Sequence, residues 1–242
     1  MKRVALLIGN SNGLSGVKND IGNWRNFLKS DYGGRWYDDE INIVMNPTKN
    51  DLSSKIDRIK ADKPDFAIVV FSGHGAYKKS TFLEINAAGE LISENYLIGI
   101  APRQISAFDC CRNVIRETIT KANESMRMFA DAIDNTMAIR RIYDARIMNA
   151  IEQQVRLYAC SVDESALDTG SGGLYTKNLL ECACSVPNSS SYKLVGVAHE
   201  EARERTVQIA NSMYHSQHPD SILPRCLSRQ QLIISINPYF CS

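Results

Sequence analysis

The sequence predicts an α/β protein with a largely parallel sheet and helices on both faces of that sheet. Short, almost continuous Val/Ile/Leu/Phe runs recur along the chain, and amphipathic helical stretches lie between them. Strands covered on both faces are apolar throughout, and a strand–helix–strand order is typical of parallel sheets. The chain has 242 residues, 44% of them hydrophobic, which is enough to bury one core. We therefore expect a single domain over residues 1–242.

Seven apolar runs are the predicted strands. They lie at residues 4–8, 41–45, 66–71, 105–108, 155–159, 194–198 and 232–236. Apolar residues at helical spacing predict the helices between them, at residues 19–28, 51–59, 173–184 and 200–213. In the first helix the apolar face consists of Ile21, Trp24, Phe27 and Leu28.

Two stretches depart from this alternation. Residues 113–150 form a charged, Met-rich helical segment that is longer than a crossover between two strands requires. We expect an insertion there, folded as a helical hairpin. Residues 216–228 contain Pro219 and Pro224 and few apolar residues, so we expect an extended loop.

Composition excludes several classes of protein. The 28 Lys and Arg nearly balance the 27 Asp and Glu, whereas nucleic-acid-binding domains carry a clear basic excess. No apolar run approaches the ~20 residues of a membrane span, and the apolar start at 4–8 turns polar before the roughly 7–15 residues of a secretory signal. The seven cysteines are odd in number and irregularly spaced, unlike a disulfide framework. We expect a cytoplasmic protein with free thiols, and neither nucleic acid nor a membrane among its partners.

Two strand ends carry the residues with the most informative chemistry. The strand at 66–71 runs into Ser-Gly-His-Gly at 72–75, and the strand at 105–108 runs into Asp-Cys-Cys-Arg at 109–112. Ligands of open α/β sheets bind beyond the carboxyl ends of the strands, and adjacent strands lie under ~5 Å apart. A histidine and a cysteine at two neighbouring ends can therefore face each other across one site.

A cysteine beside a histidine suits nucleophilic attack on a carbonyl carbon. The thiolate attacks, and the imidazole both lowers the pKa of a thiol and later protonates the leaving amine. The backbone amide of Gly75 can donate to the developing oxyanion, with the amide of Cys111 as a second donor. Taken alone, His74 is a turn residue and the cysteine a small buried hydrophobe; together they favour a Cys–His dyad. Strand alternation does not decide between Cys110 and Cys111 as the nucleophile.

These segments resemble the catalytic motifs of a known enzyme family. Ser-Gly-His-Gly at 72–75 and Asp-Cys-Cys-Arg-Asn at 109–113 are similar to the two motifs of the caspase/metacaspase superfamily of cysteine peptidases. The segments at 5–10 and 14–20 resemble the first strand and turn of metacaspases and their bacterial relatives. Residues 172–176 resemble the segment before the large helix of the C-terminal half. The resemblance implies the caspase-like (caspase–hemoglobinase) fold, with a six-stranded sheet.

The resemblance covers residues 1–112 and 151–236 and implies a role for individual residues. His74 would be the general base and acid, and Cys111 the nucleophile, with Cys110 in the place of a small residue. Asp20 and Asp109 would line the pocket for the residue before the scissile bond. Two carboxylates in one pocket repel each other unless a cation joins them, so such a pocket prefers Arg or Lys. An alternative role for Asp20 is a helix N-cap.

Several positions depart from the family pattern. Position 112 is Arg where metacaspases usually have His. Many metacaspases need calcium, held by acidic residues between and after the two motifs. The corresponding stretch offers a poorer set of donors here, so we expect no cofactor and no requirement for calcium. That set is Glu84, Asn86, Glu90, Ser93 and Glu94.

The insertion at 113–150 lies where relatives carry a processing loop. Its Arg140-Arg141 pair suits self-cleavage by an enzyme specific for basic residues. Alternatively, the segment docks a regulator or a companion protein. The resemblance thus leaves an activating protein or a small-molecule signal as candidate partners beside the peptide or protein substrate.

Two further motifs predict no site. Residues 9–13 follow a strand like a phosphate-binding loop, but they lack the Gly-x-Gly-x-x-Gly spacing and a Gly-Lys-Ser/Thr end. Cys182 and Cys184 lie in an apolar helical stretch without matching ligands nearby, so burial is favoured over zinc binding.

The sequence therefore predicts a cysteine endopeptidase that cleaves after Arg or Lys through an acyl-enzyme. Because bacterial caspase-like proteins often act as effectors, the resemblance also implies a regulated role in defence or cell death. The alternative is a catalytically silent scaffold or ligand-sensing protein that uses the helical insertion as its binding surface.

Overall fold

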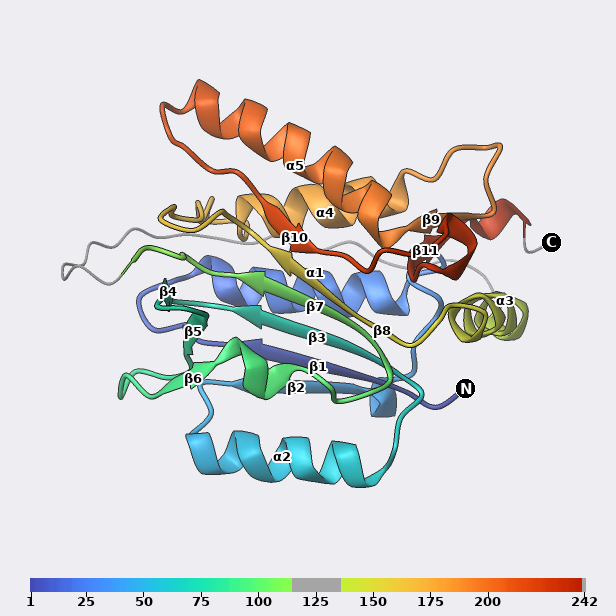
Figure 1. Cartoon of the computed structure of the whole chain (residues 1–242), viewed down its shortest axis with the longest axis horizontal. Helices are drawn as coiled ribbons and strands as arrows, with labels where there is room; N and C mark the ends of the chain where they lie inside the picture. Colours follow the sequence, from blue (N-terminus) through green and yellow to red (C-terminus); the bar gives the residue numbers. More distant parts are fainter. Residues whose placement is uncertain (115–135, 241–242) are drawn as a thin grey trace.

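A six-stranded sheet forms the centre of the molecule (Figure 1). The structure is a computed structural model, and it describes residues 1–114 and 136–240. The strands, in the order in which they lie side by side, are β10 (Asp220–Ile222), β8 (Gln153–Tyr158), β7 (Arg103–Asp109), β3 (Phe66–Ser72), β1 (Arg3–Gly9) and β2 (Ile41–Met45). Neighbouring strands are parallel except β10, which runs antiparallel to β8. The predicted largely parallel six-stranded sheet is confirmed.

Helices cover both faces of this sheet, as predicted. On one side of the sheet in Figure 1 lie α1 (Gly16–Lys29), α4 (Leu174–Cys184) and α5 (Val195–Ser212), and on the other lies α2 (Lys49–Ala61). Side chains alternate along β1, so Leu7 packs into the core that includes α1 and α4, whereas Leu6 and Ile8 pack into the core that includes α2. All seven residues of β3 are buried, which explains its unbroken apolar run.

One of the seven predicted strands is wrong, and another forms a strand outside this sheet. Residues 194–198 mostly form the start of α5, because Val195 and Ala198 are its core-facing residues; only β9 (Tyr192–Leu194) precedes it. The run at 232–236 forms β11 (Ile233–Ile236), which pairs with β9 in a separate two-stranded sheet. The sixth strand of the main sheet is β10, which lies inside the predicted extended loop at 216–228.

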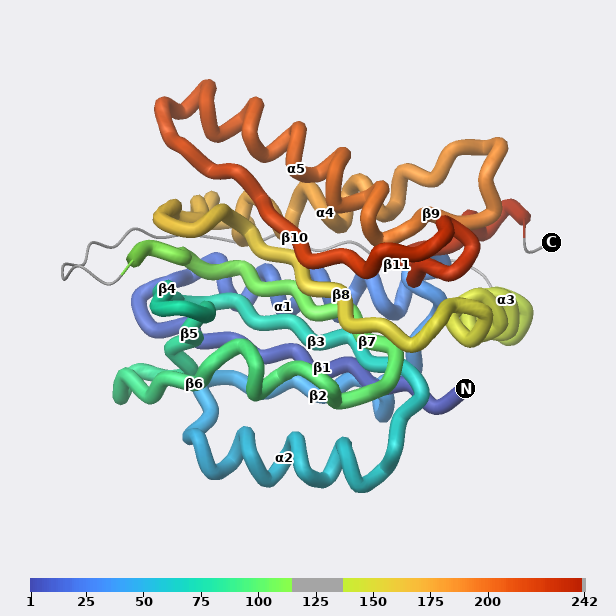
Figure 2. The backbone as a smooth tube through the Cα atoms, in the orientation of Figure 1, coloured from blue at the N-terminus to red at the C-terminus, as the bar shows by residue number. Residues whose placement is uncertain are grey.

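A small antiparallel sheet follows directly on the histidine motif. It consists of β4 (Gly75–Tyr77), β5 (Thr81–Glu84) and β6 (Leu91–Ser93). The tube view shows these strands beside the carboxyl ends of β1, β3 and β7 (Figure 2). The sequence did not predict them, since strands of three or four residues leave almost no periodic signal.

Most of the predicted insertion at 113–150 lies outside the described residues. Its last part forms α3 (Thr136–Met148), at the end of the molecule where the strands begin (Figure 1). Ile139, Tyr143 and Ile147 of α3 are buried in the same core as α1 and α4, so this helix belongs to the main body of the protein. Within the described residues, no helix is both long and apolar enough to cross a membrane.

Candidate active site

Strand register brings the two predicted catalytic residues to one place. Ser72 of β3 pairs with Asp109 of β7 at the carboxyl end of the sheet. His74 and Cys111 each follow two residues later, and the amide of Gly73 donates to the Asp109 carbonyl at 3.1 Å, which keeps the two chains together beyond the strands. The structure therefore places His74 and Cys111 at the same position of neighbouring strand ends, as the sequence predicts.

Gly75 lies directly against the cysteine pair. A Cβ atom at this position would be 2.7 Å from Cys110 Sγ and 2.8 Å from the Cys111 carbonyl oxygen, so any side chain would force the two segments apart. The glycine after the histidine is thus required for the close approach of β4 to the Cys110-Cys111 segment. Its amide, the predicted oxyanion donor, lies at this junction.

The imidazole of His74 has a defined orientation. Its Nε2 atom lies 2.7 Å from the backbone carbonyl oxygen of Asn12, in the loop after β1. Because a carbonyl only accepts hydrogen bonds, Nε2 carries a proton in this contact, which leaves Nδ1 as the nitrogen that can act as a base when the ring is neutral. This contact cannot be predicted from the sequence, since any residue type can supply a backbone carbonyl.

Cys111 is partly covered by the segment at 160–173, which connects β8 to α4. Its thiol points at the carbonyl oxygen of Ala166, with Sγ 4.0 Å from that atom. Burial raises the pKa of the Cys111 thiol, although Ala166 and Ser165 act in the opposite direction. The resting thiol is therefore neutral, and a base must remove its proton when it reacts.

Asp20 is almost fully buried, with 2% of its surface exposed. It lies within α1, whose N-cap is Ser15, so the N-cap alternative for Asp20 is wrong. Its two carboxylate oxygens accept from the Gly173 amide at 2.8 Å and from the Ser72 hydroxyl at 2.7 Å. Burial, followed by the charge of Asp109, raises the pKa of Asp20 well above its usual value.

Asp109 lies beside Asp20 and is also buried. Its Oδ2 accepts from the Thr176 amide at 3.1 Å, in the first turn of α4. Burial, together with the charge of Asp168, raises the pKa of Asp109 to about 6. Gly173 has no room for a Cβ, because that atom would collide with the Asp109 carboxylate. The structure thus brings together the two carboxylates that the sequence predicted as a pocket.

A third carboxylate, Asp168, was not predicted. It accepts from the amides of Gly16 and Gly170, each at 3.1 Å, and its charge raises the pKa of both Asp20 and Asp109. Within the described residues, no ion pair involves any of the three carboxylates. The result is a concentration of acidic groups at the carboxyl end of the sheet.

Arg112, the departure from the metacaspase pattern, has a structural role. Its guanidinium is buried, donates to Thr81 Oγ1 and the Cys160 carbonyl at 3.2 Å each, and pairs with Asp220 at 3.3 Å. It also stacks over the ring of Tyr158 at 4.0 Å. Arg112 therefore connects β5, the end of β8 and β10, and a histidine side chain is too short to make all of these contacts.

The predicted weak calcium donors do not form a shared cage. Glu94 accepts from the Thr81 amide at 3.1 Å, and Glu90 accepts from Asn86 at 2.6 Å and from the Lys49 amide at 3.3 Å. No group of three or more His, Cys, Asp or Glu within the described residues is arranged to hold a metal ion. These residues do not fit a calcium site, and no step below depends on one.

A protein-family model matches most of the chain. It is the model of the caspase domain, and it matches residues 2–216. The chain belongs to the caspase-domain family. This is a family of cysteine peptidases, and the match includes both strand-end motifs and the segment at 115–135 that the structure does not describe. No curated protein matches the chain significantly.

Solved structures share the caspase-like fold with this chain at low sequence identity. A protein from Geobacter sulfurreducens is 14% identical, with a TM-score of 0.58 over 98% of this chain and 99% of its own. Caspase-1 from Spodoptera frugiperda is 11% identical, with a TM-score of 0.57 over 91% of this chain and 86% of its own. At such identities the likeness shows the fold alone.

Proposed function

We propose that this caspase-domain protein is a cysteine endopeptidase that cleaves after Arg or Lys. His74 and Cys111 act as the dyad, and the Gly75 amide donates a hydrogen bond to the oxyanion. Asp20 and Asp109 bind the basic side chain. The observation that carries the specificity is the group of carboxylates, two of them buried, that form no ion pair within the described residues. A guanidinium or ammonium group would relieve their mutual repulsion, whereas an acidic side chain would add to it.

The reaction follows from the orientation of His74. As the peptide carbonyl approaches, Nδ1 removes the proton of the Cys111 thiol, and Sγ attacks the carbonyl carbon. The imidazolium then gives this proton to the leaving amine, and an acyl-enzyme remains. Water, deprotonated by the same Nδ1, releases the acyl group and restores the thiol. Throughout, the Asn12 carbonyl holds the Nε2 proton and stabilises the charged ring.

The segment at 160–173 must move before a substrate can bind. It contacts Cys111 through Ala166, and the amide of its last residue, Gly173, donates to a carboxylate oxygen of Asp20. The chain after α5 holds it, since Gln217 accepts from the Leu167 amide at 3.0 Å and His218 bonds Glu164 at 2.6 Å. We therefore propose a regulated effector, in cytoplasmic defence or cell death, in which an activating protein or small molecule displaces this segment. No metal cofactor, nucleic acid or membrane is part of this proposal.

A peptide-library cleavage profile tests the proposed function. Cleavage after Arg and Lys, lost in Cys111→Ala and in His74→Ala, supports it. Cys110→Ala is the matched control, since it removes the neighbouring thiol and should retain cleavage. Cleavage that persists in Cys111→Ala, or a preference for Asp before the scissile bond, would overturn the residue assignments.

The covered, neutral thiol favours one second candidate, a catalytically silent scaffold. The two are separated by an electrophilic peptide that ends in arginine. Modification of Cys111, detected by mass spectrometry and absent with a peptide that ends in aspartate, indicates the peptidase. Lack of modification under conditions that expose the site to other thiol reagents indicates the scaffold.

A further inference from the structure

Asn10 is a fully buried polar residue just past the end of β1, and the mechanism above gives it no role. It belongs to the segment at 9–13, which resembles a phosphate loop by position. The loop's amides are already used inside the protein: those of Asn10 and Asn12 donate to the Ser72 carbonyl and to Asn10 Oδ1, and that of Ser11 donates to Asn46 Oδ1. This loop is therefore organised around its own polar groups rather than around an anion.

The carboxamide of Asn10 bonds the two segments that hold His74. Its Oδ1 accepts from the Asn12 amide at 3.2 Å, and the carbonyl of Asn12 is the acceptor for His74 Nε2. Its Nδ2 donates to the Glu84 carbonyl at 2.8 Å, and the Glu84 amide in turn donates to the His74 carbonyl at 3.0 Å. One side chain thus reaches the imidazole of His74 through Asn12 and its backbone through Glu84.

A third connection runs along the main chain. The Asn10 amide donates to the Ser72 carbonyl at 2.9 Å, two residues before the histidine. Gly73 packs onto Asn10 so closely that a Cβ at position 73 would lie 2.9 Å from the Cβ of Asn10. The absence of a side chain at position 73 therefore leaves the space that Asn10 occupies.

We infer that Asn10 is a positioning residue that fixes both the orientation and the tautomer of His74. This inference rests on the proposed function, because the oriented Nδ1 is the base of that reaction. Asparagine suits the position because its side chain offers a donor and an acceptor at once. Aspartate has no hydrogen to donate to the Glu84 carbonyl, and its charge would lie near the Glu84 carboxylate, whose Oε1 is 3.4 Å from Asn10 Nδ2. Alanine offers neither group.

Nitrogen NMR of protein labelled with 15N-histidine tests this inference without reference to activity. The chain has four histidines, and a His74→Gln sample identifies the signals of His74. We expect wild-type His74 as the Nε2–H tautomer. In Asn10→Ala the Asn12 amide loses its acceptor and the Asn12 carbonyl is no longer held in place, so we expect a mixture of tautomers and, with an active enzyme, about 10–100-fold lower kcat/KM, mainly in kcat. A wild-type Nδ1–H tautomer, or unchanged His74 signals in folded Asn10→Ala, would overturn the inference.

Two further variants keep the test decisive. Asn42→Ala is the matched control, since Asn42 also donates to β1, at the Ala5 carbonyl, but lies away from His74. The His74 signals of this variant should match those of the wild type.

If Asn10→Ala does not fold, Asn10→Asp replaces it. That variant keeps the acceptor for Asn12 and loses the donor to Glu84, so the tautomer should stay while the ring shifts change. Ring shifts identical to wild type would contradict the inference. Should the wild-type protein cleave no peptide, the proposed function fails while the tautomer measurement still tests Asn10.

Discussion

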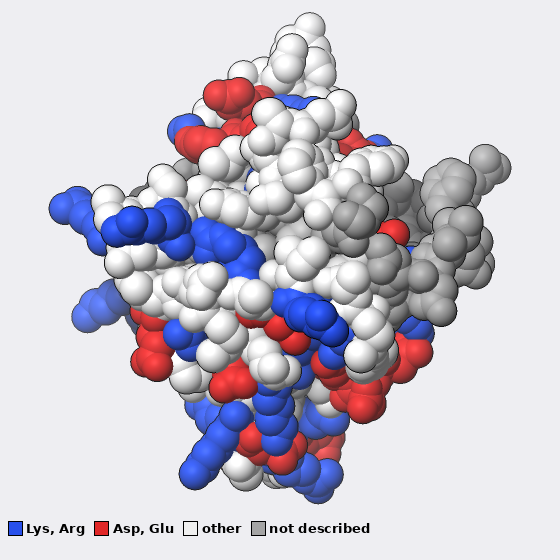
Figure 3. Space-filling model, turned by 90° about the vertical axis from the view of Figure 1, so that its right-hand side faces the viewer, with Lys and Arg blue, Asp and Glu red and all other residues white. Residues whose placement is uncertain are grey.

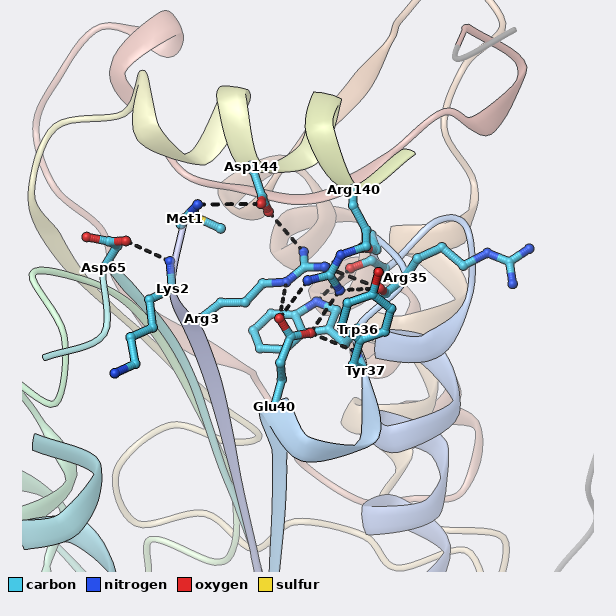
Figure 4. Close-up of polar contacts among 12 residues, drawn as sticks. Met1, Lys2, Arg3, Arg35, Trp36, Tyr37, Glu40, Asp65, Arg140 and Asp144 are labelled. Atoms are coloured by element: carbon cyan, nitrogen blue, oxygen red, sulfur yellow. Dashed lines mark hydrogen bonds and ion pairs between the residues drawn. The ribbon is translucent and has the colours of Figure 1, made fainter. Parts of the chain in front are cut away.

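Two groups of buried or partly buried ionisable side chains lie at opposite ends of the central sheet, and they differ in how their charges are balanced. Where the strands begin, Arg3 and Arg140 face Glu40 and Asp144 (Figure 4). Arg140 bonds both oxygens of Glu40, at 2.7 and 2.9 Å, and Arg3 lies 3.2 Å from Asp144. Where the strands end, Asp20, Asp109 and Asp168 meet without a cation among the described ion pairs. We refer to these as the balanced cluster and the acidic cluster.

The pKa directions express this difference. Burial would raise the pKa of Glu40, but hydrogen bonds from Arg140 and Tyr37 hold it below its usual value. Burial raises the pKa of Asp109 to about 6, and its charged neighbour Asp168 adds to the shift. In the balanced cluster each carboxylate pairs with an arginine of the protein itself, and these pairs join α3 to the rest of the fold. Among the residues that the structure describes, no cation pairs with the acidic cluster, as a site for a basic side chain requires.

The surface around the balanced cluster agrees with a structural role. At this end of the molecule Lys and Arg lie interspersed with Asp and Glu, without a field of one sign (Figure 3). Arg140 lies in a helix, pairs with Glu40 and stacks over the Tyr37 ring at 3.7 Å. Cleavage needs an extended backbone, so the Arg140-Arg141 pair is poorly suited to self-processing while α3 stays docked.

The largest expected effect is on cleavage when the acidic cluster loses a charge. We predict that Asp109→Asn lowers kcat/KM for a substrate with Arg before the scissile bond by ~100-fold or more, since truncating one side of a buried charge pair is costly. Asp20→Asn should act in the same direction. Steady-state kinetics measure both, with Arg-ended and citrulline-ended peptides compared. An equal loss of kcat/KM for the two peptides would show that these carboxylates do not line the pocket.

The balanced cluster should affect stability and leave specificity unchanged. Arg140→Met leaves Glu40 with a weaker set of partners, and we predict a loss of about 1–3 kcal/mol in the free energy of unfolding. The matched control is Arg141→Met, at the exposed neighbouring position, with little change. Urea denaturation measures both. If Arg140→Met altered the preference for Arg over citrulline, the two clusters would not be separate in function.

The raised pKa of Asp109 predicts a pH dependence with a definite sign. Protonation below pH 6 removes a charge that the basic side chain needs, so KM for the Arg substrate should rise up to about tenfold per pH unit. The free energy of unfolding depends on pH in the opposite direction. The pKa of Asp109 in the folded protein lies above the unfolded value of ~3.9, so the contribution of Asp109 to stability falls as pH rises from about 4 to about 6. Urea denaturation at several pH values should show a weaker fall in Asp109→Asn. An identical profile in both proteins would contradict the assignment.

Removal of divalent metal ions should have the smallest effect. Because the residues between the motifs do not form a calcium cage, we predict equal cleavage rates in excess chelator and in millimolar calcium. A rate restored only by calcium would show that donors outside the described residues complete a site.

The sequence predicted the parts of the site that depend on strand order. His74 and Cys111 each follow a buried strand, and the parallel sheet then brings them together without further information. Asp168 could not be found in this way, because it lies in an irregular segment whose position depends on tertiary contacts with Gly16. Asn12 acts through its backbone carbonyl, which any residue would supply.

The errors in the fold have related physical causes. Short apolar runs such as 194–198 fit the core-facing side of a helix as well as a strand, and Val195 begins a helix here. The strand β10 has three residues in a Pro-containing tail, and it forms because β8 offers an open edge to pair with. Pairing of this kind is decided by the partner strand rather than by the local sequence.

Calorimetric titration of Cys111→Ala protein with a peptide that ends in arginine tests the account most directly. The same peptide ending in citrulline, which has nearly the same shape and no charge, is the comparison. With buffers of different ionisation enthalpy near pH 6, we predict that the arginine peptide binds at least ~100-fold more tightly and releases protons as the acidic cluster ionises. Equal affinity for the two peptides, or binding without proton release, would contradict the claim that this cluster receives the basic side chain.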